Sequence, residues 1–214
     1  MAKRTVQEEE ARLYKMLNRE RELWSGGIAR VAGVDEAGRG PLAGAVYAAA
    51  VILPRGVHIL GLDDSKKLSP KRRGELYGEI IEKADGYAVA FADEKEIDEL
   101  NILRATHLAM NRAVSSLSPA PDYCIIDGNS ISGMSIAYET MVKGDAKSAS
   151  VAAASILAKV TRDRYITELA KKYPEYGFER HKGYGTKEHT EAILKYGVLP
   201  IHRKSFLKKL LSEV

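Results

Sequence analysis

The chain contains very little cysteine and no long apolar segment. Cys124 is the single cysteine among 214 residues, so a disulfide within the chain is excluded and a reducing compartment is favoured. The first residues, MAKRTVQEEEARLYK, lack the apolar core of a signal peptide, and no apolar run approaches the roughly 20 residues of a membrane-spanning helix. We therefore expect a cytoplasmic protein with no membrane segment.

Zinc-ligand spacings, P-loops, internal repeats and linkers are missing as well. The five histidines and the cysteine are dispersed without ligand spacing, which argues against a zinc site. With 45% hydrophobic and 29% charged residues, the chain has an ordinary globular composition and enough length for its own core, so we expect a monomer. The formal net charge of +4 suggests a polyanionic partner, although scattered surface lysines and arginines would produce the same value.

Apolar spacing and turn residues predict a mixed α/β fold. A helix is expected over residues 6–24, followed by a hairpin of strands over 28–34 and 43–53. Ser69 and Pro70 mark a helix start, because serine can cap free amides and proline fits the first turn. Further helices are expected to about residue 84 and over 93–100, 103–117, 147–172, 186–196 and 203–211, with strands over 87–91, 123–127 and 136–142.

This order of elements favours one five-stranded mixed sheet flanked by helices. A hairpin comes first, and strands then alternate with helices. We predict three parts of the chain: an N-terminal helix over 1–27, a sheet domain over 28–173 and a C-terminal helical segment over 174–214.

Four carboxylates stand at the ends of predicted strands or helices. Asp35 and Glu36 directly follow an apolar strand, where two charges are costly unless a cation neutralises them. The two can converge only if the strand ends or bulges there, because adjacent strand side chains point to opposite faces. Asp127 ends another apolar strand, and Asp145 precedes the long helix. Simpler interpretations are a strand end facing water, an Asp-Gly turn and a helix N-cap.

A divalent cation would explain why four carboxylates gather. Without one they would repel each other and raise one another's pKa values. Oxygen ligands favour Mg²⁺ or Mn²⁺, and Mg²⁺ usually takes only one or two carboxylates, so four of them suit two ions. The hypothesis is a two-metal site for phosphodiester cleavage, made by Asp35, Glu36, Asp127 and Asp145.

Glycine, basic and hydroxyl-bearing residues suggest contacts with phosphates. Gly38, Arg39 and Gly40 could bring backbone amides close to a substrate, or could simply form a hairpin turn. Tyr184, between two glycines, could stack on a base or sugar, or could be a partly buried loop residue. Further candidates for substrate contacts are Lys66, Lys67, Lys143, Lys182 and Ser148, the last on a helix face that could equally serve packing.

Taken together and in order, these motifs resemble the bacterial ribonuclease HII (RNase H type 2) family. They are AGVDEAGRGPLAG (32–44), DSKKLS (64–69), DG (127–128), KGD (143–145), AAASI (152–156), AKV (158–160), RD (162–163) and HKGYGT (181–186). The family's acidic catalytic positions fall on Asp35, Glu36, Asp127 and Asp145. Its ribonucleotide-sensing Gly-Arg-Gly falls on residues 38–40, and its sugar-stacking tyrosine falls on Tyr184.

The resemblance implies an RNase H-like fold and an endonuclease that hydrolyses the RNA strand of RNA–DNA hybrids. It also implies cleavage on the 5′ side of single ribonucleotides embedded in duplex DNA, leaving 3′-hydroxyl and 5′-phosphate ends. Two alternatives stay open. One is a type 3 ribonuclease H, although we expect those enzymes to carry a large N-terminal substrate-binding domain, and only about 27 residues precede the first strand here. The other is a non-catalytic nucleic-acid binding module.

Overall fold

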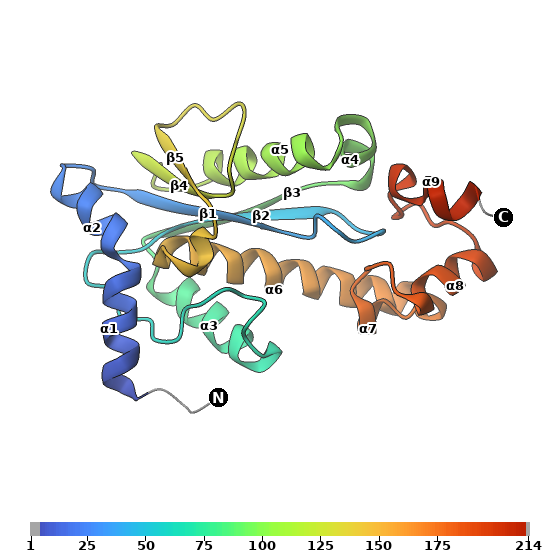
Figure 1. The fold of residues 1–214 in the computed structure, drawn as a ribbon, viewed down its shortest axis with the longest axis horizontal. Coiled ribbons are helices and arrows are strands. Elements are labelled where there is room, and N and C mark those ends of the chain that lie inside the picture. The colour runs from blue at the N-terminus through green and yellow to red at the C-terminus, as the bar shows by residue number, and fades with distance from the viewer. Residues whose placement is uncertain (1–4, 213–214) are drawn as a thin grey trace.

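Five strands form one mixed sheet in the computed structural model, which describes residues 5–212 (Figure 1). The strands are β1 (Val31–Ala37), β2 (Val46–Ile52), β3 (Gly86–Ala92), β4 (Tyr123–Asp127) and β5 (Tyr138–Met141). Their order is β3-β2-β1-β4-β5. The β1–β2 and β2–β3 pairs are antiparallel, whereas the β1–β4 and β4–β5 pairs are parallel. The predicted five-stranded mixed sheet is confirmed.

Helices cover both faces of this sheet (Figure 1). They are α3 (Pro70–Lys83) and α6 (Ala149–Lys172) on one face, and α4 (Glu94–Leu100) and α5 (Ile102–Ser115) on the other. Gly33 of β1 permits the close approach of α6, because a Cβ there would lie 2.1 Å from the backbone carbon of Ser150. The N-terminal end of α6 is thereby pressed against β1, two residues before Asp35. The predicted helix start at Ser69 is confirmed, since its hydroxyl accepts a hydrogen bond from Arg72 N (3.2 Å).

β1 continues further than the sequence predicted. The strand was expected to end at residue 34, yet Asp35 and Glu36 pair with Ala49 and Ala48 of β2 in unbroken register. The prediction that the strand ends or bulges at the acidic pair is therefore wrong. The pairing of β1 with β4 stops at Val34, so the β4-facing edge of β1 is free of that neighbour from Asp35 onward.

The leading helix is broken in two. α1 (Val6–Met16) and α2 (Asn18–Ser25) meet at Leu17, where the sequence predicted one helix over 6–24. α2 has a tertiary anchor, because the buried carboxylate of Glu20 accepts hydrogen bonds from the hydroxyls of Ser148 and Ser150 (both 2.6 Å). Within residues 5–212 no helix has the length and apolar character needed to cross a membrane.

The C-terminal segment packs around aromatic and histidine side chains. It contains η2 (Pro174–Tyr176), α7 (Phe178–His181), α8 (Lys187–Tyr196) and α9 (Lys204–Ser212). The rings of Tyr176 and Phe178 stack with centroids 5.6 Å apart, in a cluster that includes Ile166 of α6 and Leu207 of α9. The helices predicted over 186–196 and 203–211 are confirmed, whereas the sequence did not predict η2 and α7. The part boundaries near residues 28 and 174 stay predictions.

Candidate active site

Three carboxylates from β1 and β4 meet beside the sheet. One oxygen each of Asp35, Glu36 and Asp127 lie within 4.8 Å of one another. Backbone amides hold two of these groups: Glu36 N donates to Asp35 Oδ1 (2.7 Å), and Gly144 N donates to Asp127 Oδ1 (2.6 Å). Asp35 is only 4% exposed, so water solvates its charge poorly.

Asp145 lies close to this group but is not one of the three. It belongs to η1 (Gly144–Ala146), and Ser148 rather than Asp145 caps α6, so the N-cap interpretation of Asp145 is wrong. Burial, followed by the charges of Asp64 and Asp127, raises the pKa of Asp145 to about 6. Asp64 acts on Asp145 through its charge and is thus a fifth carboxylate near this place, which sequence reasoning did not assign to the site.

Burial and like charge raise the pKa values of carboxylates in this cluster, an effect that a bound cation would oppose. Burial, then the charges of Glu36 and Asp127, raises the pKa of Asp35 well above its usual value. Burial also raises the pKa of Glu36, although Arg39 opposes this with its Nη1 3.6 Å from Glu36 Oε1. For Lys66, burial acts to lower the pKa, but the surrounding carboxylates, Asp35 first, outweigh it and raise the pKa.

A divalent cation fits this set of donors. All of the donors are carboxylate oxygens, the ligands that Mg²⁺ and Mn²⁺ prefer. The side-chain cations Lys66 and Arg39 are fewer than the carboxylates they face, so negative charge remains uncompensated. Among residues 5–212, the trio from β1 and β4 is the one group of three or more His, Cys, Asp or Glu side chains close enough to share an ion.

The acidic pair opens into a cleft of about 550 Å³, which we call the acidic cleft. Its lining contains Asp35, Glu36, Ala37, Gly38, Arg39, Gly40, Ser65, Lys66, Ile102, Ser155, Lys159, Tyr184 and Phe206. Tyr184 is 42% exposed, and a Cβ added to Gly40 would lie 3.5 Å from its ring. The structure therefore brings the Gly-Arg-Gly turn and Tyr184 together with the acidic pair, although they are about 145 residues apart in sequence.

Two buried arginines donate to backbone carbonyls, Arg203 to those of the Gly-Arg-Gly turn itself and Arg162 to those of the segments beside it. Arg203 donates to Gly38 O (2.6 Å), Arg39 O (2.9 Å) and Gly44 O (2.6 and 2.9 Å). Arg162, also fully buried, donates to the carbonyls of residues 43, 45 and 182 at 3.2 to 3.3 Å. Burial lowers the pKa of Arg203 to about 9. Sequence reasoning quoted Arg162 as part of a motif without a role, and it missed Arg203.

A histidine chain holds the loop that carries Tyr184. His189 Nδ1 lies 2.9 Å from Tyr184 O, and because a carbonyl only accepts, this nitrogen carries the proton. His189 Nε2 then accepts from His202 Nε2 (3.0 Å), and His202 Nδ1 accepts from Leu199 N (2.8 Å). Burial lowers the pKa of both histidines to about 4, so they are neutral near pH 7. His181 supports the same loop by accepting from Gly183 N (3.2 Å).

The four lysines predicted to bind phosphate do not share one hollow. Lys66 lines the acidic cleft. Lys67 lines a separate hollow beside α1, and Lys182 lines a third, where it donates to Thr167 Oγ1 (2.9 Å). Lys143 is exposed between β5 and η1. Of the four, Lys66 is thus the one beside the carboxylates.

Ser148 has a structural place instead of a substrate-facing one. It has no exposed surface, its hydroxyl accepts from Val151 N (3.2 Å), and it donates to Glu20 Oε1 (2.6 Å). The interpretation of Ser148 as a substrate contact is therefore wrong, because its buried hydroxyl caps α6 and anchors α2.

Comparison with known proteins places these residues in a family. A family model described as Ribonuclease HII matches residues 32–209. Ribonuclease HII of Acetivibrio thermocellus is 57% identical over 197 residues, which cover 92% of this chain and 77% of that protein. Ribonuclease HII of Clostridioides difficile is 52% identical over 206 residues, covering 96% and 81%.

A solved structure agrees with these matches. The crystal structure of ribonuclease H2 from Pyrococcus horikoshii OT3 superposes with a TM-score of 0.73 at 30% identity, covering 86% of this chain and 98% of that one. The match to the Ribonuclease HII family model, over residues 32–209, includes all the residues that line the acidic cleft. The chain belongs to the ribonuclease HII family, enzymes that hydrolyse the RNA strand of RNA–DNA hybrids.

Proposed function

We propose that this enzyme cuts duplex DNA on the 5′ side of a single embedded ribonucleotide, as well as the RNA strand of hybrids, and leaves 3′-hydroxyl and 5′-phosphate ends. The observation that carries the proposal is the acidic cleft itself. Within it, the buried Asp35 and the partly buried Glu36 lie next to a backbone turn and a half-exposed tyrosine. A scissile phosphodiester and the ribose on its 3′ side are the substrate parts that such a pairing can hold together.

Asp35, Glu36 and Asp127 would hold two Mg²⁺ or Mn²⁺ ions, with Asp145 completing the set. The chemistry supplied by bound divalent ions is activation of the attacking water and stabilisation of the leaving 3′-oxygen. The carboxylates themselves orient and neutralise; they do not attack phosphorus. Gly144 N keeps the Asp127 carboxylate in place, and the backbone of Glu36 does the same for Asp35.

Discrimination between ribose and deoxyribose would come from the turn at residues 38–40. Only the 2′-hydroxyl distinguishes the two sugars, so polar groups must be held against it. The carbonyls of Gly38 and Arg39 are already engaged by the buried Arg203, which fixes the direction of the peptide groups in this turn. Tyr184, whose ring lies beside Gly40, would then pack against the sugar.

A three-substrate assay tests this function. The protein is incubated with a DNA duplex carrying one ribonucleotide, a long RNA–DNA hybrid and an all-DNA duplex, each with Mg²⁺, Mn²⁺ or a chelator. We expect cutting of the first two substrates, product ends on the 5′ side of the ribonucleotide, and no cutting of the all-DNA duplex or with chelator. Comparable cutting of the all-DNA duplex would refute ribonucleotide recognition. Binding without any cleavage would instead favour a non-catalytic binding module.

The expectations of a monomer and of a cytoplasmic location stay predictions. Neither the geometry of the acidic cleft nor the substrate assay tests these two expectations.

A further inference from the structure

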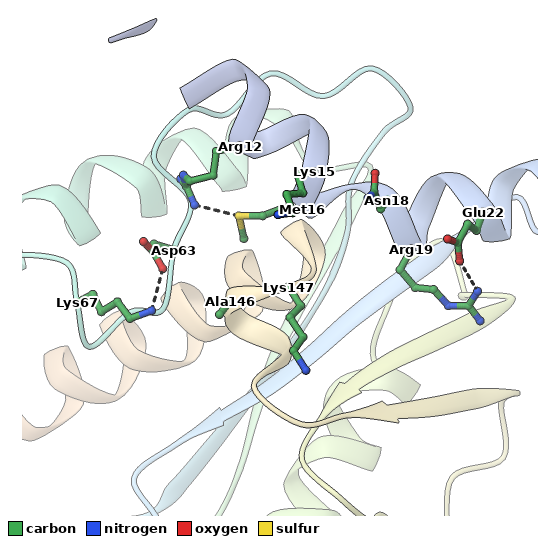
Figure 2. A pocket seen from close by; sticks show the side chains of 10 residues that line it. All are labelled: Arg12, Lys15, Met16, Asn18, Arg19, Glu22, Asp63, Lys67, Ala146 and Lys147. Carbon is green, nitrogen blue, oxygen red and sulfur yellow. Dashed lines mark hydrogen bonds and ion pairs between the residues drawn. The ribbon is translucent and has the colours of Figure 1, made fainter. Parts of the chain in front are cut away.

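A hollow separate from the acidic cleft lies beside the N-terminal helices. It measures about 630 Å³ against about 550 Å³ and lies between the N-terminal helices, the loop at residues 63–67 and η1 (Figure 2). We call it the N-terminal basic groove. Its lining residues are Arg12, Lys15, Met16, Asn18, Arg19, Glu22, Asp63, Lys67, Ala146 and Lys147. Five of these are cationic and two are acidic, so the groove carries an excess of positive charge.

Three of the five cations have carboxylate partners. Arg12 pairs with Glu9 (2.8 Å), and Arg19 pairs with Glu22 (2.8 Å) and Glu139 (2.6 Å). Lys67 faces Asp63 at the longer distance of 3.4 Å and stays 59% exposed. The charges of Arg12 and Arg19 are therefore largely compensated by neighbouring carboxylates.

Lys15 and Lys147 supply the uncompensated charge. Both are exposed, and within residues 5–212 no side-chain hydrogen bond or ion pair is found for either. Figure 2 shows Lys15 on α1 and Lys147 on the segment that follows η1, with no dashed line to either. Two solvated ammonium groups from separate elements thus border one hollow, an arrangement that attracts an anion with several charges.

Residues adjacent in sequence line the groove and the acidic cleft. Lys66 lines the cleft and the next residue, Lys67, lines the groove. Asp145 faces the carboxylates, and the residues that follow it, Ala146 and Lys147, line the groove. In Figure 1 the N-terminal helices lie at one end of the molecule and α8 and α9 at the other, with the sheet and α6 between them.

We propose that the N-terminal basic groove binds the sugar-phosphate backbone of the substrate duplex on one side of the cut. The inference rests on the proposed function, because a duplex seated with its scissile phosphate in the acidic cleft must continue beyond it. The lining contains no aromatic side chain, so bases are not stacked there and binding is independent of sequence. The N-terminal helices are then part of the substrate path, joined to the sheet domain through Glu20.

The test uses the double variant Lys15→Ala, Lys147→Ala in the full chain. A matched control is Lys171→Ala, Lys172→Ala, which removes the same charge at the far end of α6, a helix of 24 residues and therefore about 36 Å long. Binding to a duplex with long arms on both sides of one ribonucleotide is measured by fluorescence anisotropy with chelator, as a function of salt. kcat/KM with Mg²⁺ is then compared for duplexes in which either arm is shortened to a few base pairs.

Two lost phosphate contacts should flatten the plot of log affinity against log salt by about 1.8. From 50 to 200 mM salt, this difference in slope should reduce the ratio of wild-type to variant duplex affinity about tenfold. The control should keep the wild-type slope. The loss in kcat/KM should vanish when one particular arm is shortened and persist when the other is shortened.

Three results would overturn the proposal: a wild-type slope for the variant, an equal change in the control, or a loss in kcat/KM that persists with both arms short. Loss of binding to a polyglutamate peptide without loss of duplex binding would assign the groove to an acidic protein instead. If wild type cleaves no ribonucleotide-containing duplex, the proposed function fails, whereas the anisotropy result still decides whether the groove binds a duplex.

Discussion

Replacing Arg203 by lysine should disturb the Gly-Arg-Gly turn and leave the carboxylate cluster unchanged. Arg203 is fully buried, and three of its nitrogens donate to the carbonyls of Gly38, Arg39 and Gly44. Lysine keeps the charge but has a single nitrogen, which cannot stand at three separate positions. At least one carbonyl of the turn is therefore left without its donor.

The size of the effect follows from those bonds. A hydrogen bond to a charged group contributes about 1.5 to 3 kcal/mol, and a buried group left unsatisfied costs about 1 to 3 kcal/mol. Burial already lowers the pKa of Arg203 to about 9, and lysine would keep a charge at the same poorly solvated place. We expect the free energy of unfolding to fall by about 2 to 4 kcal/mol. A turn displaced by about 1 Å should reduce kcat/KM on a single-ribonucleotide duplex by about a hundredfold.

Chemical denaturation and single-ribonucleotide cleavage measure the two effects. The thermal shift caused by Mg²⁺ should remain, because the carboxylates lie on β1 and β4 and not on the turn. Arg30→Lys is the matched control, since Arg30 is exposed and pairs with Asp122, so both readouts should change little. A variant at Arg203 that is destabilised yet cleaves like wild type would refute the positioning role of the turn.

Three further outcomes are expected. Tyr184→Ala should lose most cleavage of a single embedded ribonucleotide and Tyr184→Phe less, measured as kcat/KM, because phenylalanine keeps the ring; equal losses would contradict sugar packing. The pKa values of Asp35 and Asp145, the latter about 6, are raised, so the folded chain binds more protons than the unfolded one. The free energy of unfolding therefore falls as pH rises from the ordinary carboxyl pKa through these raised values. Mg²⁺ should therefore raise Tm more near pH 7 than near pH 5 in thermal denaturation, and an equal shift at both would count against a metal site. Lys66→Ala should flatten the salt dependence of duplex binding by about one unit, and an unchanged slope would remove Lys66 from the phosphate path.

The sequence predicted those parts of the site that have local signals. Asp35, Glu36 and Asp127 follow apolar strands, and apolar strands that end in carboxylates are recognisable without a structure. The sheet was predictable for the same reason, since its strands and helices have clear periodicity. The bounds of β1 were not, because its antiparallel partner β2 continues past the point where β4 stops.

The supports of the site were not predictable, because they depend on contacts between distant segments. Arg203 reaches a turn more than 160 residues away, and a buried arginine has the same letter as a solvated one. The histidines at 181, 189 and 202 looked dispersed, yet His189 hydrogen-bonds to His202 and stacks on His181. His181 and His189 also hydrogen-bond to the backbone of the loop that carries Tyr184. Ser148 was predicted on a substrate-facing helix side, but the buried carboxylate of Glu20 engages its hydroxyl. In each case the tertiary partner decides the role.

The most direct test of the central claim is cleavage by Asp127→Asn on a duplex with one ribonucleotide under Mg²⁺. The substitution removes a charge from the carboxylate cluster with little change in shape, and the amide oxygen can still accept from Gly144 N. Wild type should cut once, on the 5′ side of the ribonucleotide, and spare the matching all-DNA duplex. The variant should fold, bind the duplex and cut neither. Turnover of the variant at the wild-type rate would contradict cleavage by ions held on these carboxylates.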